Sequence, residues 1–304
     1  MNRPVFDAHC DTLGLLSDGI DLNSQQTEVT LSGVRQYPKW TQVFAIWLEA
    51  EAMDIDKQYR ALYERYIQKT TEFHSVLTKR DLQATSPLKS ILGVEGGDIL
   101  KGDISRLQTL FDQGVRLMTL TWNTPNELGD TNKTVRSPSG LSPFGKEVVR
   151  HMNRLGMAVD VSHLSDRGFW DTIRVTTKPV LASHSNARGV CQHPRNVTDA
   201  MFLAIKRTGG GVGINLYPPF LGEAADIQTA IAHILHFLSL GGEDHVGLGM
   251  DLDGTGGRLP GGFSTCKDTK ALFDALQQAG VSEEIITKIA YTNMERMFAK
   301  ILPA

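Results

Sequence analysis

Short apolar segments alternate with longer amphipathic segments along the whole chain. This alternation is typical of βα units, in which a helix follows each strand, and not of an all-β sandwich. Several apolar segments contain almost no polar residue, as expected of parallel strands buried on both faces. The pattern predicts eight strands, at residues 4–11, 42–49, 90–95, 116–122, 158–163, 180–184, 211–216 and 245–251.

The segments between these strands have helical periodicity and helix boundary signals. Helices are predicted over residues 54–69, 144–155 and 227–240. Ser142 and Pro143 predict the N-cap and first turn of the second helix, and Gly156 predicts its end. In the third helix the apolar stripe excludes His233 and His236, which we expect on the surface or in a groove.

The number of βα units predicts the fold class. There is no internal repeat and no linker rich in Gly, Ser or Pro. We therefore expect residues 1–304 to form one domain, an α/β fold with a single (β/α)8 barrel of the TIM type. Two long loops, 123–141 and 253–266, follow predicted strands on the face that carries the active site in barrel enzymes. They are candidate walls of a substrate pocket.

Composition and charge restrict the partners and the compartment. The 304 residues are 41% hydrophobic, enough for a sizeable core, and 31 Lys and Arg oppose 34 Asp and Glu without a basic stretch. We expect neither nucleic acid nor membrane as a partner. Three scattered cysteines, Cys10, Cys191 and Cys266, form no disulfide framework or zinc knuckle. The first residues lack the apolar region of a secretion signal, and no apolar run is long enough to span a membrane, so we expect a cytoplasmic protein.

Side chains able to bind a metal stand where the predicted strands end. His9 and Asp11 flank Cys10 and point to one side of the first strand, because side chains alternate along a strand. Glu95 ends the apolar segment before two glycines, where an unpaired buried carboxylate would be costly. Taken alone, Glu95 could instead pair with a basic residue of the barrel.

Two histidines and two aspartates complete the group. His163 and His184 follow the fifth and sixth predicted strands, and Asp251 and Asp253 follow the last one. In a barrel, the ends of the strands meet on one face, so His9, Asp11, Glu95, His163, His184 and Asp251 would converge. Imidazoles and carboxylates suit Zn²⁺ or a similar divalent ion.

The number of ligands indicates two ions. A single tetrahedral ion with an open position cannot use five or six ligands, whereas two ions about 3.5–4 Å apart can, with Glu95 as the bridge. Such a pair lowers the pKa of its bound water to about 7 and supplies hydroxide at neutral pH. The Gly-rich segments 209–211 and 254–257 match neither a phosphate-binding loop nor a dinucleotide fingerprint, and no GxSxG elbow is present.

Several motifs, in one order along nearly the whole chain, resemble those of the renal or membrane dipeptidase family of binuclear zinc peptidases. They are DAHCDT, GVEGGD, GVRLMTLTWN, DVSHLSDRGFWD, PVLASHSNARGVCQHPRNVTD, HVGLGMDLDG and TNMERMF. The resemblance implies that one zinc is bound by the first-strand pair, that the Glu bridges, and that the two later histidines bind the second zinc. These positions are His9, Asp11, Glu95, His163 and His184.

The resemblance also implies roles in substrate binding and proton transfer. It assigns Arg195 to the substrate carboxylate and Asp251 to acid–base catalysis beside Glu95, with Asp253 as the alternative. Better-known members have histidines where this chain has Asp98 and Trp122, so we expect Trp122 and Asn123 to contact substrate instead.

These observations predict a zinc-dependent dipeptidase that uses a metal-bridging hydroxide, with L,D-dipeptides among the candidate substrates and other divalent ions as alternatives to zinc. A homodimer is the family expectation. Two other functions remain open: a different barrel amidase or deaminase that depends on metal, and a catalytically silent metal-binding scaffold.

Overall fold

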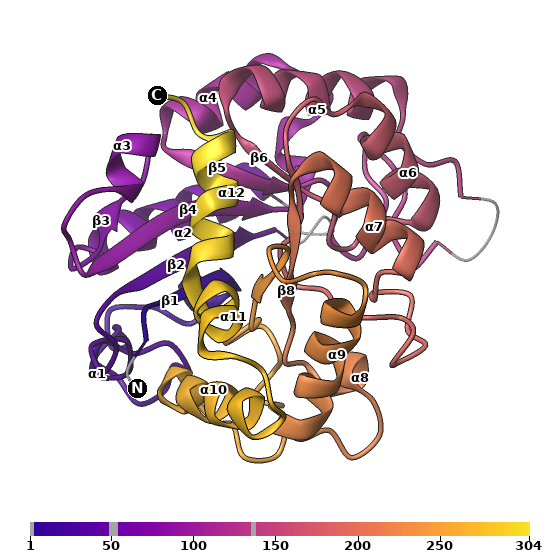
Figure 1. The fold of residues 1–304 in the computed structure, drawn as a ribbon. Coiled ribbons are helices and arrows are strands. Elements are labelled where there is room, and N and C mark those ends of the chain that lie inside the picture. Colours follow the sequence, from indigo (N-terminus) through magenta and orange to yellow (C-terminus); the bar gives the residue numbers. More distant parts are fainter. Residues whose placement is uncertain (1–2, 49–53, 135–137) are drawn as a thin grey trace.

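A closed ring of parallel strands forms the centre of the computed structural model, which describes residues 3–48, 54–134 and 138–304 (Figure 1). The strands pair in the order β2-β1-β9-β8-β7-β6-β5-β4-β3, and β2 also pairs with β4, which closes a ring of eight. The ring strands are β1 (Val5–Cys10), β2 (Trp40–Trp47), β4 (Leu88–Glu95), β5 (Val115–Thr119), β6 (Ala158–Asp160), β7 (Val180–Ala182), β8 (Gly211–Ile214) and β9 (Val246–Leu248).

The predicted (β/α)8 barrel is therefore confirmed, and each of the eight predicted strands overlaps one strand of the ring. The predicted ends were too late in several strands, since β6 stops at Asp160 and β7 at Ala182. Glu49, the last residue of the second predicted strand, lies outside the described residues. The two-residue strand β3 (His74–Ser75) was not predicted; it pairs with the start of β4, before β5 joins that strand.

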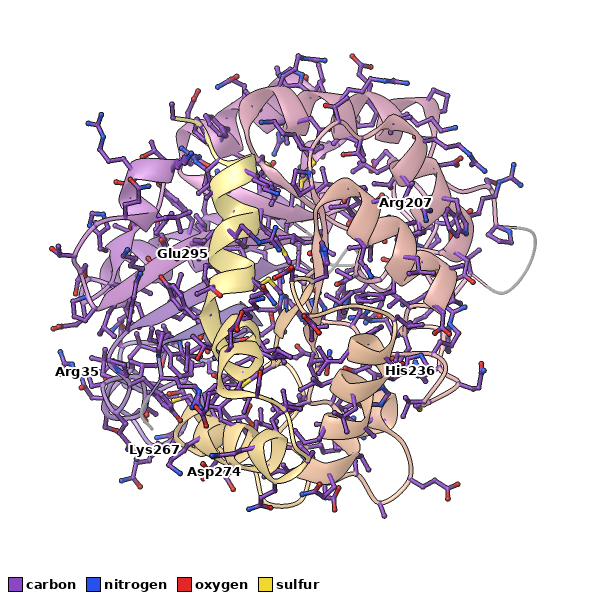
Figure 2. All side chains as sticks on the ribbon, viewed as in Figure 1. Arg35, Arg207, His236, Lys267, Asp274 and Glu295 are labelled. Carbon is purple, nitrogen blue, oxygen red and sulfur yellow. The ribbon has the colours of Figure 1, made fainter. Side chains whose placement is uncertain are left out.

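Helices surround the ring, and the three predicted ones are present. The longer helices are α2 (Ile55–Lys69), α4 (Ser105–Asp112), α5 (Pro143–Leu155), α6 (Asp166–Val175), α7 (Asp199–Thr208), α9 (Ile227–Ser239), α10 (Thr269–Gln278) and α12 (Asn293–Ile301). The side chain of Ser142 caps α5 by accepting a hydrogen bond from Gly145 N, and Gly156 ends the helix at φ 81°. The outer faces carry charges of both signs, such as Lys267, Asp274 and Arg207 (Figure 2).

Short helical segments complete the chain. They are η1 (Thr12–Gly14), α1 (Leu31–Val34), α3 (Lys79–Leu82), η2 (Gly97–Leu100), α8 (Pro218–Leu221), η3 (Cys266–Asp268), α11 (Glu283–Thr287) and η4 (Lys288–Thr292). Within the described residues, every helix is too short or too polar to cross a bilayer.

The last helix closes one end of the barrel. In Figure 1, α12 lies across the ring, at the end where the strands begin. Its Met294, Met297 and Phe298 are fully buried and belong to one apolar cluster with inward-facing strand residues such as Phe6. The rings of Phe6 and Phe298 stack with their centroids 5.3 Å apart. The barrel interior is thus a packed core, sealed at this end by α12.

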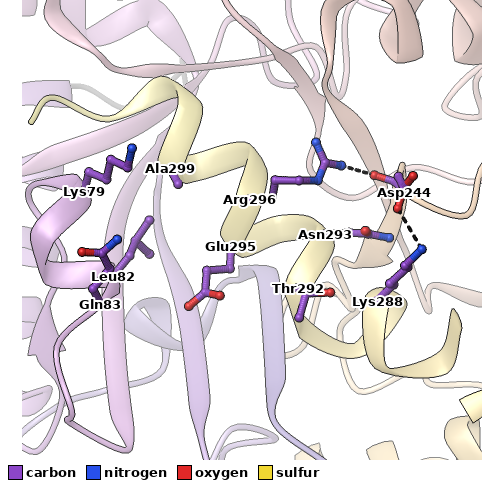
Figure 3. A pocket seen from close by; sticks show the side chains of 10 residues that line it. All are labelled: Lys79, Leu82, Gln83, Asp244, Lys288, Thr292, Asn293, Glu295, Arg296 and Ala299. Carbon is purple, nitrogen blue, oxygen red and sulfur yellow. Dashed lines mark hydrogen bonds and ion pairs between the residues drawn. The ribbon is translucent and has the colours of Figure 1, made fainter. Parts of the chain in front are cut away.

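A hollow of about 400 Å³ lies beside α12 at this sealed end (Figure 3). Lys288 lies 3.2 Å from the carboxylate of Asp244 in this hollow, and Arg296 donates to the main-chain oxygen of Asp244. Active sites of barrel enzymes lie at the opposite end, where the strands end, so this hollow is not the candidate active site.

Candidate metal centre and substrate pocket

The six predicted metal-binding and acid–base side chains lie together at the open end of the ring. Glu95 is the last residue of β4, and the others lie in β1 or within three residues after β1, β6, β7 or β9. Five are buried, with exposed fractions of 0% for His9, 1% for Glu95, 8% for His163, 1% for His184 and 9% for Asp251. The convergence expected from parallel strands is therefore present.

Glu95 lies between two sets of these side chains. Its Oε1 atom lies 3.0 Å from His163 Nε2 and 3.2 Å from His184 Nε2. Its Oε2 atom lies 3.6 Å from His9 Nε2. Each oxygen of the carboxylate thus faces a different set, as a bridging ligand requires.

The second set surrounds His9. Its Nε2 atom lies 3.5 Å from Asp11 Oδ1 and 3.8 Å from Asp251 Oδ1. The possible ligand atoms of His9, Asp11 and Asp251 all lie within 4.8 Å of one another, and so do those of His9, Glu95 and His184. These separations are within reach of ions placed between the side chains.

Unusual backbone conformations aim several of these groups. His163 and Asp251 have φ values of 70° and 62°, in the left-handed region that costs energy for residues other than glycine. The backbone after β9 also passes close to these carboxylates. A Cβ atom at Gly254 would collide with the carboxylates of both Asp11 and Asp251. Strain and close approach at one place are typical of a functional site.

The electrostatics of the site differ between its histidines. Burial lowers the pKa of His163 and His184 well below the ordinary value, and the charge of Arg195 lowers both further. Neutral imidazoles are the form that binds metals. Burial also lowers the pKa of His9, but the charges of Glu95 and Asp11 outweigh it and raise that pKa to about 10. The carboxylates therefore require a positive charge in their midst.

The donor set fits divalent ions. Both ring nitrogens of His9, Oδ1 of Asp11 and Oε1 of Glu95 are buried atoms without a hydrogen-bond partner among the described residues. His163 Nε2 and His184 Nε2 face each other at 3.1 Å beside Glu95 Oε1, where one shared proton would satisfy only part of the group. Cations would satisfy His9 Nε2 and the two carboxylate oxygens together, because each of these atoms can bind a metal ion.

A pocket of about 610 Å³ opens above these residues. Arg195 lines it and is 5% exposed. Its Nη1 atom lies 3.4 Å from Ser185 Oγ and its Nη2 atom 3.3 Å from His184 O, while Nε has no partner among the described residues. The guanidinium is therefore held in place with donors left for a ligand.

Trp122 and Asn123, which are predicted to contact substrate, also line the pocket. The ring of Trp122 packs against that of Trp47, with centroids 5.1 Å apart, and its centroid lies 6.4 Å from that of His163. Asp98, the other departure from the better-known members, is not among the lining residues and accepts a hydrogen bond from Asn126 Nδ2 at 3.1 Å.

The two candidate acid–base residues have different surroundings. Asp251 lines the pocket, and Asn215 Nδ2 donates to its Oδ2 at 2.9 Å, which leaves Oδ1 toward His9. Asp253 instead accepts from Thr12 Oγ1 at 2.6 Å and from Glu28 N at 2.7 Å. The geometry thus favours Asp251 as the group that can reach a substrate.

Sequence reasoning missed part of the pocket wall. Both long loops contribute to the lining, through Asn132 and Lys133 of the first loop and Gly254 of the second, although residues 135–137 lie outside the described residues. The residues missed are Trp47, His193, Pro194, Tyr217, Pro219 and Phe220. Trp47 is the last residue of β2 and the others follow β7 or β8, so position at or after the end of a strand was the available signal.

The expected position of His233 was wrong. It is fully buried in α9, where its Nδ1 atom accepts from Ala187 N at 3.0 Å and its Nε2 atom lies 3.0 Å from Leu221 O. The helix is covered by the segment after β8 as well as by the ring, so its buried face is wider than the apolar stripe indicated. His236 is partly exposed and lies 2.7 Å from Asp199.

Comparison with known proteins identifies relatives of the whole chain. The family profile of membrane dipeptidase (peptidase family M19) matches residues 1–302. A protein of Schizosaccharomyces pombe, named an uncharacterized dipeptidase, is 35% identical over 259 residues, which are 84% of this chain and 62% of that protein. This chain thus spans less than two thirds of the length of that relative.

Two solved structures share the fold over the whole length. One is a dipeptidase and metallopeptidase of family M19, with a TM-score of 0.91, 24% identity and 100% of each chain covered. The other is a metallopeptidase of Rhodobacter sphaeroides bound to a phosphinate mimic of the dipeptide L-Ala-D-Ala, with a TM-score of 0.88 and 23% identity. The comparison covers 99% of this chain and 100% of the second structure.

Proposed function

The chain belongs to the membrane dipeptidase family, peptidase family M19, and on this premise we propose that it hydrolyses the peptide bond of dipeptides with the help of two divalent ions, zinc in the first place. The observation that carries the proposal is Glu95, whose two oxygens face different sets of ligands. Arg195 and Asp251 line the same pocket as Glu95. They supply a cation for the carboxylate of a short substrate and a group that can transfer a proton.

Five side chains would hold the ions: His9, Asp11, Glu95, His163 and His184. Divalent ions at such a site lower the pKa of a bound water toward 7 and polarise a carbonyl group, each of which assists hydrolysis. The remaining steps depend on residues of the chain itself.

Arg195 is proposed to bind the C-terminal carboxylate of the substrate. The guanidinium of Arg195 lies over the ring of Phe220, with 5.3 Å between its central carbon and the ring centroid. This position and the contacts to Ser185 and His184 fix the plane of the guanidinium. A planar guanidinium binds a carboxylate through two parallel hydrogen bonds. This contact sets which peptide bond lies over Glu95, and a chain that continued past that carboxylate would not fit.

Asp251 is proposed to carry the proton from the attacking water to the leaving amine. Burial raises the pKa of Asp251 to about 6, which brings the carboxyl close to neutral pH and so suits both acceptance and release of a proton. Asn215 holds one oxygen in place and leaves the other free for this exchange.

The pocket limits the size of the substrate. A volume of about 610 Å³ lies within the range of small-ligand pockets and accommodates a dipeptide. Trp47 and Trp122 form an apolar wall, which would contact a substrate side chain. The dipeptide mimic bound by the Rhodobacter sphaeroides structure makes L,D-dipeptides a natural part of the test.

The decisive experiment combines metal analysis of the purified protein with hydrolysis of L,L- and L,D-dipeptides. We expect two divalent ions per chain and release of both amino acids. The variant Arg195→Ala should lower kcat/KM at least 30-fold for free dipeptides, because a buried charge pair is lost, and should change it little for C-terminal amides.

The same panel separates the alternatives. Hydrolysis of cyclic amides or deamination without dipeptide cleavage would favour a different barrel amidase or deaminase. Two bound ions without turnover of any compound would favour the scaffold.

A further inference from the structure

His184 differs from the other two histidines of the centre in how its second ring nitrogen is held. Its Nδ1 atom lies 2.7 Å from Ser183 Oγ, and Ser183 Oγ lies 2.6 Å from Asp160 Oδ2. Within the described residues, Nδ1 of His9 and Nδ1 of His163 have no hydrogen-bond partner. A buried chain from Asp160 through Ser183 therefore reaches His184 alone.

Asp160 fixes the direction of the hydrogen bonds in this series, because each group bonded to its carboxylate is a donor. Its Oδ1 atom accepts from two main-chain amides, Ser162 N at 3.0 Å and Ser183 N at 2.8 Å. Its Oδ2 atom accepts from Thr119 Oγ1 at 2.6 Å as well as from Ser183 Oγ. All three side chains are fully buried, so water does not compete for these bonds.

Ser183 has one hydroxyl hydrogen, and its two near acceptors are Asp160 Oδ2 and His184 Nδ1, whereas Ser162 Oγ is farther away at 3.4 Å. A carboxylate is the stronger acceptor, since hydrogen bonds to a charged group are about twice as strong as neutral ones. The hydrogen therefore goes to Asp160, and Ser183 Oγ must accept from His184 Nδ1. The ring then carries its hydrogen on Nδ1, and its Nε2 atom, which faces Glu95 Oε1 at 3.2 Å, keeps a free electron pair.

We propose that Asp160 and Ser183 are positioning residues that fix the tautomer of His184 and so keep its Nε2 atom ready to bind a divalent ion. This inference rests on the metal site of the proposed function. It accounts for a fully buried aspartate that the mechanism does not otherwise use, and partners of this kind typically change metal affinity 10- to 100-fold.

The backbone around Ser183 holds the hydrogen-bonded side chains of Asp160, Ser183 and His184 in place. A Cβ atom at either Gly213 in β8 or Gly249 just after β9 would collide with Ser183 O, so both positions require glycine where the chain leaves β7. His184 N donates to Ser162 Oγ at 3.2 Å, and its ring stacks on that of His9 with centroids 3.8 Å apart. The imidazole therefore has little freedom to turn away.

The first test needs no substitution. Nitrogen-15 NMR of the metal-free wild-type protein, with histidine labelled, reports which ring nitrogen carries the hydrogen. We expect His184 to be in the Nδ1–H form. A predominant Nε2–H form, or an even mixture of the two, would overturn the inference.

The second test measures the dissociation constants of Zn²⁺ by competition with a chromophoric chelator. Ser183→Ala should weaken one of the two ions roughly 10- to 100-fold, and Ser183→Thr, which keeps the hydroxyl, should restore binding. The matched control is Ser90→Ala, which removes another buried strand hydroxyl, one bonded to Tyr66 OH at 2.9 Å, far along β4 from the centre. Ser183→Ala with wild-type dissociation constants would refute the proposal.

The third test uses Asp160→Asn to reverse the direction of the hydrogen bonds between residue 160, Ser183 and His184. Two main-chain amides require an oxygen at the Oδ1 position, so the new NH₂ group must face Ser183 Oγ. The serine then gives its hydrogen to His184 Nδ1, which forces the ring hydrogen onto Nε2, the wrong tautomer for a ligand. We expect Asp160→Asn to weaken the same ion at least tenfold more than Ser183→Ala, and an effect equal to or smaller than that of Ser183→Ala would count against the proposal.

The outcomes separate this inference from the proposed function. If the wild-type protein binds no divalent ion, the metal site itself is wrong. If it binds two and the substitutions change neither dissociation constants nor tautomer, only the role of Asp160 and Ser183 is wrong.

Discussion

Glu95→Gln is the substitution that most directly tests a shared ligand. In the structure Glu95 is 1% exposed, and its two oxygens face His163 and His184 on one side and His9 on the other. Glutamine has almost the same shape but lacks the charge and presents NH₂ to one set. Both ions should therefore bind more weakly, whereas loss of a ligand that serves one ion would weaken only that ion.

The expected size follows from linkage between binding and folding. If each affinity falls about 100-fold, saturating metal stabilises the variant by about 2.7 kcal/mol less per ion, or about 5 kcal/mol in total. With an unfolding entropy of about 2.1 cal/mol/K per residue, that difference corresponds to a Tm about 8 °C lower for a chain of 304 residues.

The sign should change when the metal is removed. Burial raises the pKa of Glu95 well above its ordinary value, because a carboxylate charge is poorly solvated at this position when no cation is bound. In excess chelator, Glu95→Gln should therefore unfold at or above the Tm of the wild-type protein. Thermal unfolding by circular dichroism, with chelator and with Zn²⁺, measures both differences.

The matched control is Glu28→Gln at the same end of the barrel. Burial raises the pKa of Glu28 to about 7, but this carboxylate accepts from Asp253 N and belongs to neither ligand set. Its variant should keep two ions and the full rise of Tm with metal. Two tightly held ions in Glu95→Gln, or an equal loss of Tm with and without metal, would show that Glu95 is not the bridge.

Three further substitutions test other parts of the molecule. Asp251→Asn should lower kcat about 10²- to 10⁴-fold, and Asp253→Asn much less; steady-state kinetics would reject the assignment if the two losses were equal. Trp122→Ala should raise KM for dipeptides with bulky side chains and leave kcat within about threefold, because it removes apolar wall and no polar contact; a selective loss of kcat would contradict this. Lys89 is fully buried, and burial lowers its pKa to about 8. The unfolded chain has a pKa of about 10.4 there and binds the proton more tightly, so the charge destabilises the fold by up to about 3 kcal/mol below pH 8 and the penalty disappears as the pH rises to about 10.5. Lys89→Met should therefore raise Tm by about 5 °C at pH 7 and by much less at pH 10; a lower Tm at pH 7 would refute this.

Much of the candidate metal centre could be predicted because the order of the strands brings its residues to one end of the ring. Parallel strands in a ring bring their carboxyl ends to one face, so residues as distant as His9 and His184 meet without any local signal linking them. Strand alternation could not place His163 or Asp251, since both lie beyond the last paired residue and have positive φ values. Their orientation depends on loop conformation, which periodicity does not report.

The pocket wall and the buried hydrogen bonds were beyond sequence reasoning. Tyr217 and Phe220 reach the pocket because the chain after β8 folds back in the short helix α8, and no apolar period predicts that path. The hydrogen-bond chain from Asp160 to His184 depends on Ser183, which directly follows β7, and the carboxylate of Asp160 in β6 also accepts from Thr119 in β5. Hydroxyl groups are common in sequences, and only coordinates show which of them share one carboxylate.

The helix α12, which closes the barrel at the end opposite the metal centre, has a consequence for biosynthesis. The side chains that complete the interior, Met294, Met297 and Phe298, leave the ribosome after every strand of the ring has been made. Until then the inner apolar surface of a nascent chain is open to water, which favours aggregation of incomplete chains. Closure of the barrel interior therefore has to await the synthesis of α12.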